Sequence, residues 1–268
     1  MKSLVAGARD VAVNYFAHRT AAERYAKSRP YFHPLVIERM RTVLDFAWPV
    51  RNAVDVACGT GQSAVALAEL ADSVIAVDLS PAMLAQAPEH PRIRYVEASA
   101  EELPVESQSA QLMTVSLALH WLDRTRFLAE ARRILQPGGA LVIYGNDFHG
   151  RMQENPEFAI WYGKHYFARY PTPPRNKWPL PEEEAQVHGF TFAAQESYTN
   201  TRSFSPEELA QYLMTHSNVI AAVEQGGEPV EAVFAWLLES LRPLFPDARG
   251  TFVFGGDIWF LKPRLGNE

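Results

Sequence analysis

Short apolar runs alternate with helical patterns along the first half of this chain of 268 residues, and no other feature restricts the fold as much. Each run is rich in β-branched or other apolar residues, and enough chain for a crossover helix separates it from the next. This is the pattern of a parallel sheet whose two faces are covered by helices. The predicted strands are residues 53–56, 74–77, 93–96, 112–117 and 140–144.

Residues with capping chemistry mark where the covering helices begin and end. Ser80 followed by Pro81 gives an N-cap with proline at the first helical position. Asp123 is a candidate cap for a helix through Leu135, and the Pro-Gly-Gly sequence that begins at Pro137 ends that helix. The predicted α/β core therefore covers residues 50–145.

The composition changes after Tyr144, where six prolines are interleaved with aromatic residues before position 182. We expect an irregular aromatic insertion in that stretch. Ser205 opens a capping box with Glu208 and predicts a helix through about Ala222. Pro229 opens a second helix.

Two late apolar or alternating segments, residues 190–204 and 251–261, are predicted as strands. Together with the five earlier strands they give an α/β fold. The predicted architecture is a Rossmann-like, doubly wound, mostly parallel sheet of seven strands with an antiparallel late strand and a helical, aromatic cap insertion.

The charge balance argues against a nucleic-acid partner, because 25 basic residues face 31 acidic ones and the net charge is −6. The single cysteine, Cys58, cannot form an internal disulfide or a thiolate metal cage. The apolar run at the N-terminus is too short for a signal peptide or a membrane span. We expect a cytoplasmic protein without membrane association, present as a monomer or homodimer.

The most informative segment is DVACGTGQSA, which begins at Asp55 and delivers a strand into a small-residue turn and a helix. Glycines there let the backbone approach a ligand closely beside the helix N-terminus. Asp78 ends the next strand and follows Gly59 by 19 residues. A carboxylate in that place can accept hydrogen bonds from both hydroxyls of a ribose, so the pattern indicates nucleoside binding.

A nicotinamide-dependent dehydrogenase is an alternative, since residues 59–64 also satisfy a loose dinucleotide-binding pattern. Asp55 argues against it, because a carboxylate at the strand end would repel a pyrophosphate and attract the ammonium of an amino-acid tail. In addition, none of the ten tyrosines is followed by lysine four residues later. A solvated glycine turn without a ligand is the remaining structural alternative.

Four strings of the sequence resemble, in order and spacing, the successive motifs of class I S-adenosylmethionine-dependent methyltransferases. They are DVACGTG, VIAVDLSPAMLAQA, EASAEELPVESQSAQLMTVSLALHW and FLAEARRILQPGGALVIY, and they cover about residues 50–145. The segment HWLD at 120–123, the early Arg-Pro-Tyr at 29–31 and the late SFSPEELAQYLMTHS are similar to the small-molecule branch that includes trans-aconitate methyltransferase-like proteins.

The resemblance implies S-adenosylmethionine as the cofactor and assigns its contacts. Asp55 would hold the methionine ammonium directly or through water, and Asp78 would bind the ribose hydroxyls. Ser99 stands where the family has aspartate, so the contact with the adenine amino group passes to a backbone carbonyl or to Glu101. Ala57 replaces the first glycine of the loop. The other implied cofactor residues are Gly59, Gly61, Leu79, Met83, Ala100 and Leu117.

The N-terminal segment 14–32 resembles the lid that folds over the cofactor in related enzymes. Arg29 would pair with the methionine carboxylate, and Tyr15 or Tyr25 would face the sulfonium. The alternative is an amphipathic helix whose aromatic side chains pack on the sheet.

Methyl transfer needs donor and acceptor held in line in a dry pocket, and a base only where the acceptor carries a proton. His120, at the end of the fourth predicted strand, is the candidate base, with a loop-positioning role as its alternative. An aromatic-lined site suits a small organic acceptor with a carboxylate or hydroxyl oxygen. The candidate substrate residues are Trp121, Trp161, Tyr162, His165 and Arg169, with Tyr166 and Trp178 among their aromatic neighbours.

Mutual burial of these aromatic side chains, or a dimer face, is the alternative to substrate contact. The sequence contains no zinc-protease or nucleophile-elbow motif, so no metal and no hydrolase triad is expected. We predict one methyltransferase domain over residues 1–268 that acts on a small molecule. Its parts are lid helices at 1–49, the cofactor core at 50–145, cap insertions with one strand at 146–250 and a final strand at 251–268. An NAD(P)-dependent oxidoreductase and a non-catalytic cofactor-binding protein are the alternatives.

Overall fold

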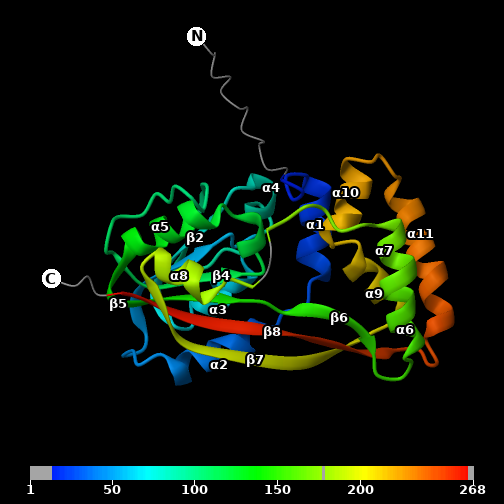
Figure 1. Cartoon of the computed structure of the whole chain (residues 1–268). Coiled ribbons are helices and arrows are strands. Elements are labelled where there is room, and N and C mark those ends of the chain that lie inside the picture. Colours follow the sequence, from blue (N-terminus) through cyan, green and yellow to red (C-terminus); the bar gives the residue numbers. More distant parts are fainter. Residues whose placement is uncertain (1–13, 177–178, 265–268) are drawn as a thin grey trace, which may run out of the picture.

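A computed structural model describes residues 14–176 and 179–264 of the chain. Figure 1 shows a sheet with helices on both faces and a second group of helices at the far end of its longest strands. The strands are β1 (Val50–Val56), β2 (Ala71–Asp78), β3 (Ile93–Glu97), β4 (Ala110–Ser116), β5 (Leu135–Tyr144), β6 (Asp147–Met152), β7 (Phe190–Phe204) and β8 (Gly250–Pro263).

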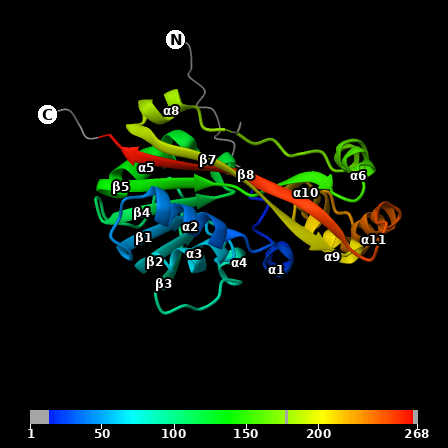
Figure 2. The same ribbon diagram turned by 90° about the horizontal axis from the view of Figure 1, so that it is seen from below.

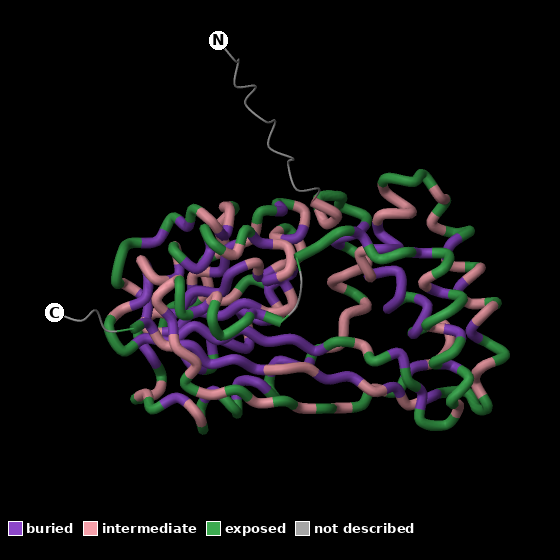
Figure 3. Tube along the Cα trace, viewed as in Figure 1, coloured by how far each residue is buried: buried purple, intermediate pink, exposed green. Residues whose placement is uncertain are grey.

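Strands β1 to β5 pair in parallel in the order β3-β2-β1-β4-β5, and the antiparallel β8 follows β5. Val54 in the central strand pairs with Ile75 on one side and with Met113 on the other. The α/β, Rossmann-like prediction is therefore confirmed, including the antiparallel late strand. Buried stretches follow these strands, and exposed residues gather on the helices and loops around them (Figure 3).

One edge of β8 pairs first with β5, from Leu141 opposite Leu261, and then with β6, from Asp147 opposite Gly255. The other edge pairs with β7 over nearly its whole length. Strand β6 is thus a continuation of β5 that the sequence analysis did not predict. Strands β6, β7 and β8 extend beyond the core as a three-stranded arm (Figures 1 and 2).

The predicted helix caps at Asp123 and Ser205 are confirmed. Asp123 accepts a hydrogen bond from the backbone N–H of Arg126, and Ser205 forms a complete capping box with Glu208. The helices are α1 (Arg19–Ser28), α2 (His33–Val43), α3 (Gln62–Leu67), α4 (Pro81–Leu84), α5 (Arg124–Ile134), α6 (Glu157–Ile160), η2 (Trp161–Tyr166), α7 (Phe167–Arg169), α8 (Glu182–Val187), α9 (Pro206–Leu213), α10 (Ser217–Glu224) and α11 (Val230–Leu241), with short 3₁₀ turns η1 (Leu119–Trp121) and η3 (Arg242–Leu244).

Two expectations about the second half were wrong. The helix from Ser205 does not reach Ala222: it ends after Leu213, and the hydroxyl of the buried Thr215 donates to the carbonyl oxygen of Tyr212 before α10 begins. The stretch after β6 is irregular only in part: α6, η2 and α7 form consecutive helical segments, which contradicts the expectation for residues 157–169, whereas residues 170–176 and 179–181 belong to no helix or strand. Helices α6, η2, α7, α9, α10 and α11 pack around an aromatic core on the arm, and we call this group the helical lobe.

Candidate functional site

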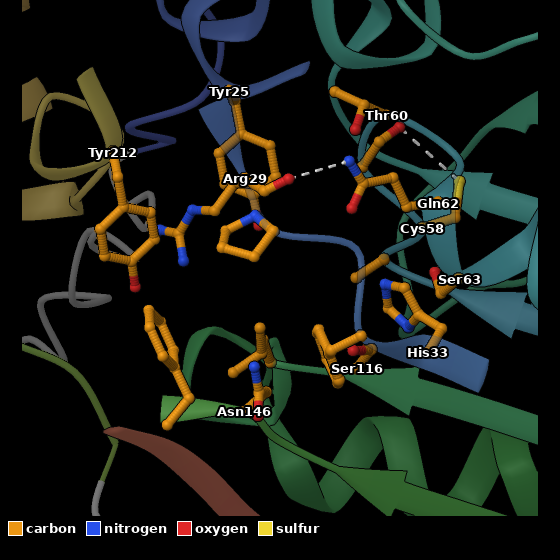
Figure 4. Close-up of a pocket in the computed structure, with 16 residues that line it drawn as sticks. Tyr25, Arg29, His33, Cys58, Thr60, Gln62, Ser63, Ser116, Asn146 and Tyr212 are labelled. Atoms are coloured by element: carbon orange, nitrogen blue, oxygen red, sulfur yellow. Dashed lines mark hydrogen bonds between the residues drawn. The ribbon is translucent and has the colours of Figure 1, made fainter. Parts of the chain in front are cut away.

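A cavity of about 670 Å³ lies where the carboxyl ends of β1, β2 and β4 face the helical lobe. Helix α1 and the residues before it form part of its wall. Ligands bind at this edge of a parallel sheet because the strand-to-helix loops there offer free backbone groups. A smaller space of about 50 Å³ adjoins it beside the glycine loop (Figure 4).

The glycine loop after β1 holds three consecutive odd-numbered residues at positive φ: Ala57 at 54°, Gly59 at 55° and Gly61 at 79°. Ala57 and Gly59 line the cavity as predicted. A Cβ at Gly59 would lie 3.1 Å from the methyl carbon of Met83. Gly61 faces away, since a Cβ there would meet the hydroxyl of Tyr95 at 2.7 Å, so its contribution is to let the chain turn into α3.

Asp78 lies on the cavity wall, and backbone N–H groups fix the orientation of its carboxylate. Its Oδ2 accepts a hydrogen bond from the backbone N–H of Gly59 at 2.8 Å, and its Oδ1 accepts one from Ser80 at 2.8 Å. Burial raises the pKa of Asp78, and these backbone N–H groups act in the opposite direction. Each carboxylate oxygen keeps a second lone pair for a ligand, so two neighbouring hydroxyls can be bound at once.

Asp55 does not line the cavity. Its side chain is completely buried beneath the loop, where Oδ2 accepts from the Ser63 hydroxyl at 2.5 Å and Oδ1 from the Thr114 hydroxyl at 2.6 Å. Burial raises its pKa to about 6, although both hydroxyls lower it. A direct contact with a methionine ammonium is therefore not offered by this geometry, because both oxygens are directed at the protein's own groups.

Next to Asp78 the cavity is lined by the apolar side chains of Leu79 and Met83 and by the polar side chains of Ser99 and Glu101. Leu79 is 59% exposed and reaches into the cavity, and Met83 lies behind it. Across the cavity, the Ser99 hydroxyl donates to one oxygen of Glu101, whose other oxygen accepts from the backbone N–H of Asp123 at 2.9 Å. Ala100 and Leu117 also line the cavity as predicted.

Arg29 lines the smaller space together with residues of the glycine loop (Figure 4). Its guanidinium carbon lies 4.7 Å from the centre of the Tyr25 ring and 5.3 Å from that of Tyr212, and Nη2 donates to the carbonyl oxygen of Thr215 at 3.0 Å. Nε is buried without a hydrogen-bond partner. Among the described residues, no carboxylate lies within 4.0 Å of the guanidinium, so its charge is available to an anionic ligand.

Trp121 and His120 lie on the cavity wall, as predicted. The rings of Tyr15 and Phe16 pack against Trp121 at centroid distances of 5.6 and 6.5 Å, so the segment before α1 covers this corner. Burial, assisted by the nearby Arg175, lowers the pKa of His120 to about 4. His120 is therefore a neutral imidazole at pH 7.

Only part of the predicted substrate wall faces the cavity. Tyr162 lines it, but Trp161 is buried in the lobe against Phe158 and Trp236. His165 is exposed and away from the cavity. The exposed Arg169 forms an ion pair with Glu228, and Trp178 lies outside the described residues.

Several residues on the lobe side of the cavity were not predicted. They come from β6, from the loop after α7 and from the lobe helices, and their positions depend on long-range pairing of the arm that local patterns do not reveal. The capping box at Ser205 was the one local signal, because it starts the helix that carries Tyr212. The residues missed are Asn146, Asp147, Phe148, Phe167, Arg175, Tyr212, His216 and Asn218.

A family model described as a methyltransferase domain matches residues 54–143. A protein of Dictyostelium discoideum named as a methyltransferase is 25% identical over 214 residues, or 76% of this chain and 80% of that protein. An uncharacterized methyltransferase of Mycobacterium tuberculosis is 28% identical over 207 residues, or 77% of this chain and 79% of that protein. The structure of a protein from Anaeromyxobacter dehalogenans, titled as a type II methyltransferase, matches with a TM-score of 0.65 and 25% identity over 89% of this chain and 99% of that one.

The chain is an S-adenosylmethionine-dependent methyltransferase. The glycine loop and Asp78 of this methyltransferase fall inside the matched region, whereas the lid and the helical lobe fall outside it. The dehydrogenase alternative is thereby set aside, and the narrower likeness to trans-aconitate methyltransferases stays a prediction. In residues 14–176 and 179–264 the methyltransferase has no helix both long and apolar enough to cross a bilayer.

Proposed function

We propose that the cavity binds S-adenosylmethionine between the glycine loop, Asp78 and Arg29, and that the methyl group passes to a small molecule held against the helical lobe. The acceptor atom is a carboxylate or hydroxyl oxygen of a small organic compound. When bound, the cofactor supplies an electrophilic methyl group on a positively charged sulfur.

The observation that carries the proposal is that one cavity is lined by two charged groups, a carboxylate and a guanidinium, that keep hydrogen-bonding capacity for a ligand. Asp78 offers free lone pairs, and Arg29 offers, within the described residues, a guanidinium without a carboxylate partner. A nucleoside joined to an amino acid needs this pair of partners. The ribose hydroxyls fit Asp78, and the amino-acid carboxylate fits Arg29.

The base would lie between Leu79 and Met83 on one side and residues 99–101 on the other. The Ser99 hydroxyl and the Glu101 carboxylate, which are hydrogen-bonded to each other, form the polar side of this base-binding part of the cavity. Tyr25 and the strained Leu117 line both the main cavity and the smaller space beside the glycine loop, and the proposal places the sulfonium next to them. An aromatic face attracts such a cation.

The chain's own residues then orient and enclose the reactants. Tyr15 and Phe16, packed on Trp121, cover the cavity, and the Ser80 hydroxyl donates to the carbonyl oxygen of Phe16 at 2.7 Å. A closed wall excludes water and holds donor and acceptor in line, which accounts for about 7–11 kcal/mol of barrier lowering in well-oriented reactions. His120 lies on the same wall and is proposed to position the loop after β4.

Isothermal titration with S-adenosylhomocysteine and with adenosine tests this function. Asp78→Asn should weaken both ligands by 10-fold or more, because both carry the ribose hydroxyls. Asp72→Asn, an exposed change at the opposite end of the same strand, serves as the matched control. Wild-type protein that binds neither ligand, or Asp78→Asn that binds both as tightly as wild type, would contradict the assignment. Transfer of a labelled methyl group from S-adenosylmethionine into a small-molecule extract distinguishes the enzyme from a non-catalytic binding protein.

A further inference from the structure

His216 lies on the lobe side of the cavity, directly before α10, and has no part in the cofactor contacts proposed above. Its ring packs edge-on against Tyr212 at a centroid distance of 4.9 Å. A histidine on a cavity wall can donate, accept or exchange a proton, depending on which ring nitrogen carries the hydrogen. The surrounding hydrogen bonds decide that question.

Three hydrogen bonds fix the hydrogen on His216. The Asn218 side-chain nitrogen donates to the carbonyl oxygen of Tyr170 at 2.7 Å, and because that oxygen can only accept, the orientation of the Asn218 amide is set. The Tyr166 hydroxyl donates to the Asn218 side-chain oxygen at 3.2 Å. This uses the one hydrogen of the phenol, so its oxygen is the acceptor for His216 Nδ1 at 3.0 Å. Nδ1 therefore carries the hydrogen, and Nε2 carries a lone pair.

Nε2 is open to the cavity. It makes no hydrogen bond within the described residues, and it is not among their buried unpartnered atoms. Burial, with the charges of Arg29 directly after α1 and of Arg175 in the loop after α7, keeps the pKa of His216 well below its usual value. His120 differs, because no hydrogen bond among the described residues fixes its ring.

We propose that His216 Nε2 accepts the proton that leaves the methyl acceptor. The proposal rests on the proposed function and narrows its substrate class to compounds whose nucleophilic atom carries a proton, with a hydroxyl or phenol in place of a carboxylate. In the step, a lone pair of the acceptor atom forms the bond to the methyl carbon. The methyl–sulfur bond breaks with its electron pair left on sulfur, and the acceptor's proton moves to Nε2.

The imidazolium so formed keeps its Nδ1–H bond to Tyr166 and returns its new proton to water. The two nearby guanidinium groups favour that release, because like charges destabilise the imidazolium. The helical lobe would thus supply the proton acceptor, whereas the glycine loop and Asp78 hold the cofactor. A carboxylate acceptor would need no such group, since it is already ionised at neutral pH.

The arrangement of hydrogens can be measured without an acceptor. Protein labelled with ¹⁵N-histidine, with the His216 signals assigned from His216→Gln, should show a neutral ring protonated at Nδ1 at pH 7. Tyr166→Phe removes the acceptor of that hydrogen and should shift the ring toward Nε2 protonation. A wild-type ring that is protonated at Nε2, or doubly protonated, at pH 7 would overturn the proposal.

The kinetic test uses labelled S-adenosylmethionine and a deproteinised small-molecule extract. Glutamine keeps a hydrogen-bond acceptor but no basic nitrogen, so His216→Gln should lose at least 100-fold in transfer rate and keep its S-adenosylhomocysteine affinity within about threefold. His165→Gln, an exposed site, is the matched control and should be unaffected. Near-normal transfer by His216→Gln, or loss of cofactor affinity in parallel with transfer, would refute the role. Wild-type protein that does not transfer or does not bind the cofactor contradicts the proposed function instead, and the nitrogen spectrum still decides the ring state.

Discussion

Ala57 and Leu117 lie at the carboxyl ends of neighbouring parallel strands, line the same cavity and share a φ of 54°. The left-handed region costs a residue with a Cβ about 1–2 kcal/mol. The strain is therefore concentrated where the cofactor is proposed to bind, as expected where geometry at a site matters more than local stability.

Substitutions at Ala57 and Gly59, two positions apart in the glycine loop, should change the free energy of unfolding in opposite directions. Ala57→Gly should raise the free energy of unfolding by about 0.5–1 kcal/mol, because glycine adopts this φ without strain. Gly59→Ala should lower it by about 1–2 kcal/mol, since it adds strain and a contact with Met83 at 3.1 Å. Urea denaturation of both variants measures the two changes. A destabilised Ala57→Gly protein would show that the strain assigned to this residue is absent.

Arg29 should discriminate between ligands with and without a carboxylate. Arg29→Gln should weaken S-adenosylhomocysteine by about 10- to 100-fold, the range for one charged hydrogen bond, and leave adenosine unchanged. Titration of both ligands into both proteins gives the four affinities. Equal losses for the two ligands would mean that Arg29 supports the cavity through Tyr25 and Tyr212 without contacting the amino-acid end.

Local chemistry explains which parts of the fold could be predicted. The existence of the five early strands, the caps at Ser80, Asp123 and Ser205, and both late strands depend on nearby residues, and the structure confirms them. The predicted start of the fifth strand was wrong, because β5 begins at Leu135 and includes Pro137 and the two glycines that were expected to follow the helix. Strand β6 was missed because its segment pairs only with β8, about a hundred residues later. The break after Leu213 depends on a buried threonine that sequence patterns do not distinguish from any helical residue.

The residues of the site also fall into a group that local motifs predict and a group that they do not. Asp78, Leu79, Met83 and Arg29 were predicted from motifs and lie on the cavity wall. The lobe side was not predictable, because the π-helical segment η2 has more residues per turn than an α-helix, so each residue rotates the chain by less than an α-helix pattern assumes. Trp161 and Tyr166 consequently enter the aromatic core of the lobe, while Tyr162 faces the cavity.

His33 should make stability depend on pH. The side chain is buried against Tyr144, its Nδ1 lies 3.0 Å from the phenol oxygen, and burial lowers its pKa to about 3. The unfolded chain binds a proton at His33 below about pH 6.5 and the folded protein does not, so stability falls as pH falls from there toward 3. Between pH 7 and pH 5 the loss through this residue is about 2 kcal/mol.

Denaturation of wild type and His33→Gln at pH 7 and pH 5 isolates this effect. The difference between the two pH values should be smaller in the variant by about 2 kcal/mol. Contributions from His120 and Asp55 cancel, because both proteins retain them. His165→Gln, at an exposed site, should behave as wild type. An unchanged pH dependence in His33→Gln would mean that His33 is protonated in the folded protein.

Glu224 fastens the lid helix to the helical lobe. Its Oε1 accepts from the Thr20 hydroxyl and from Arg24 Nη2, each at 2.8 Å, and His18 lies 3.5 Å from its other oxygen. The Arg24 and Glu224 side chains are only 18% and 12% exposed, so solvent screens this pair less than a surface ion pair. Because α1 and the residues before it form part of the cavity wall, loss of the pair should speed release of a bound cofactor.

Glu224→Gln should therefore destabilise the protein by about 1–3 kcal/mol and increase the dissociation rate of S-adenosylhomocysteine several-fold. Stopped-flow displacement, followed by tryptophan fluorescence, measures that rate, and Trp121 beneath the lid is a suitable reporter. Glu23→Gln is the matched control, since Glu23 is on α1, the helix of Arg24, and its side chain is 48% exposed. Among the residues that the structure describes, its ion pair is with Arg19 alone, at 3.6 Å. It should leave both quantities unchanged. A Glu224→Gln protein that releases the ligand at the wild-type rate would contradict this expectation. The contacts between α1 and α10 would then not be the contacts that retain the ligand, and movement of α1 would not limit dissociation.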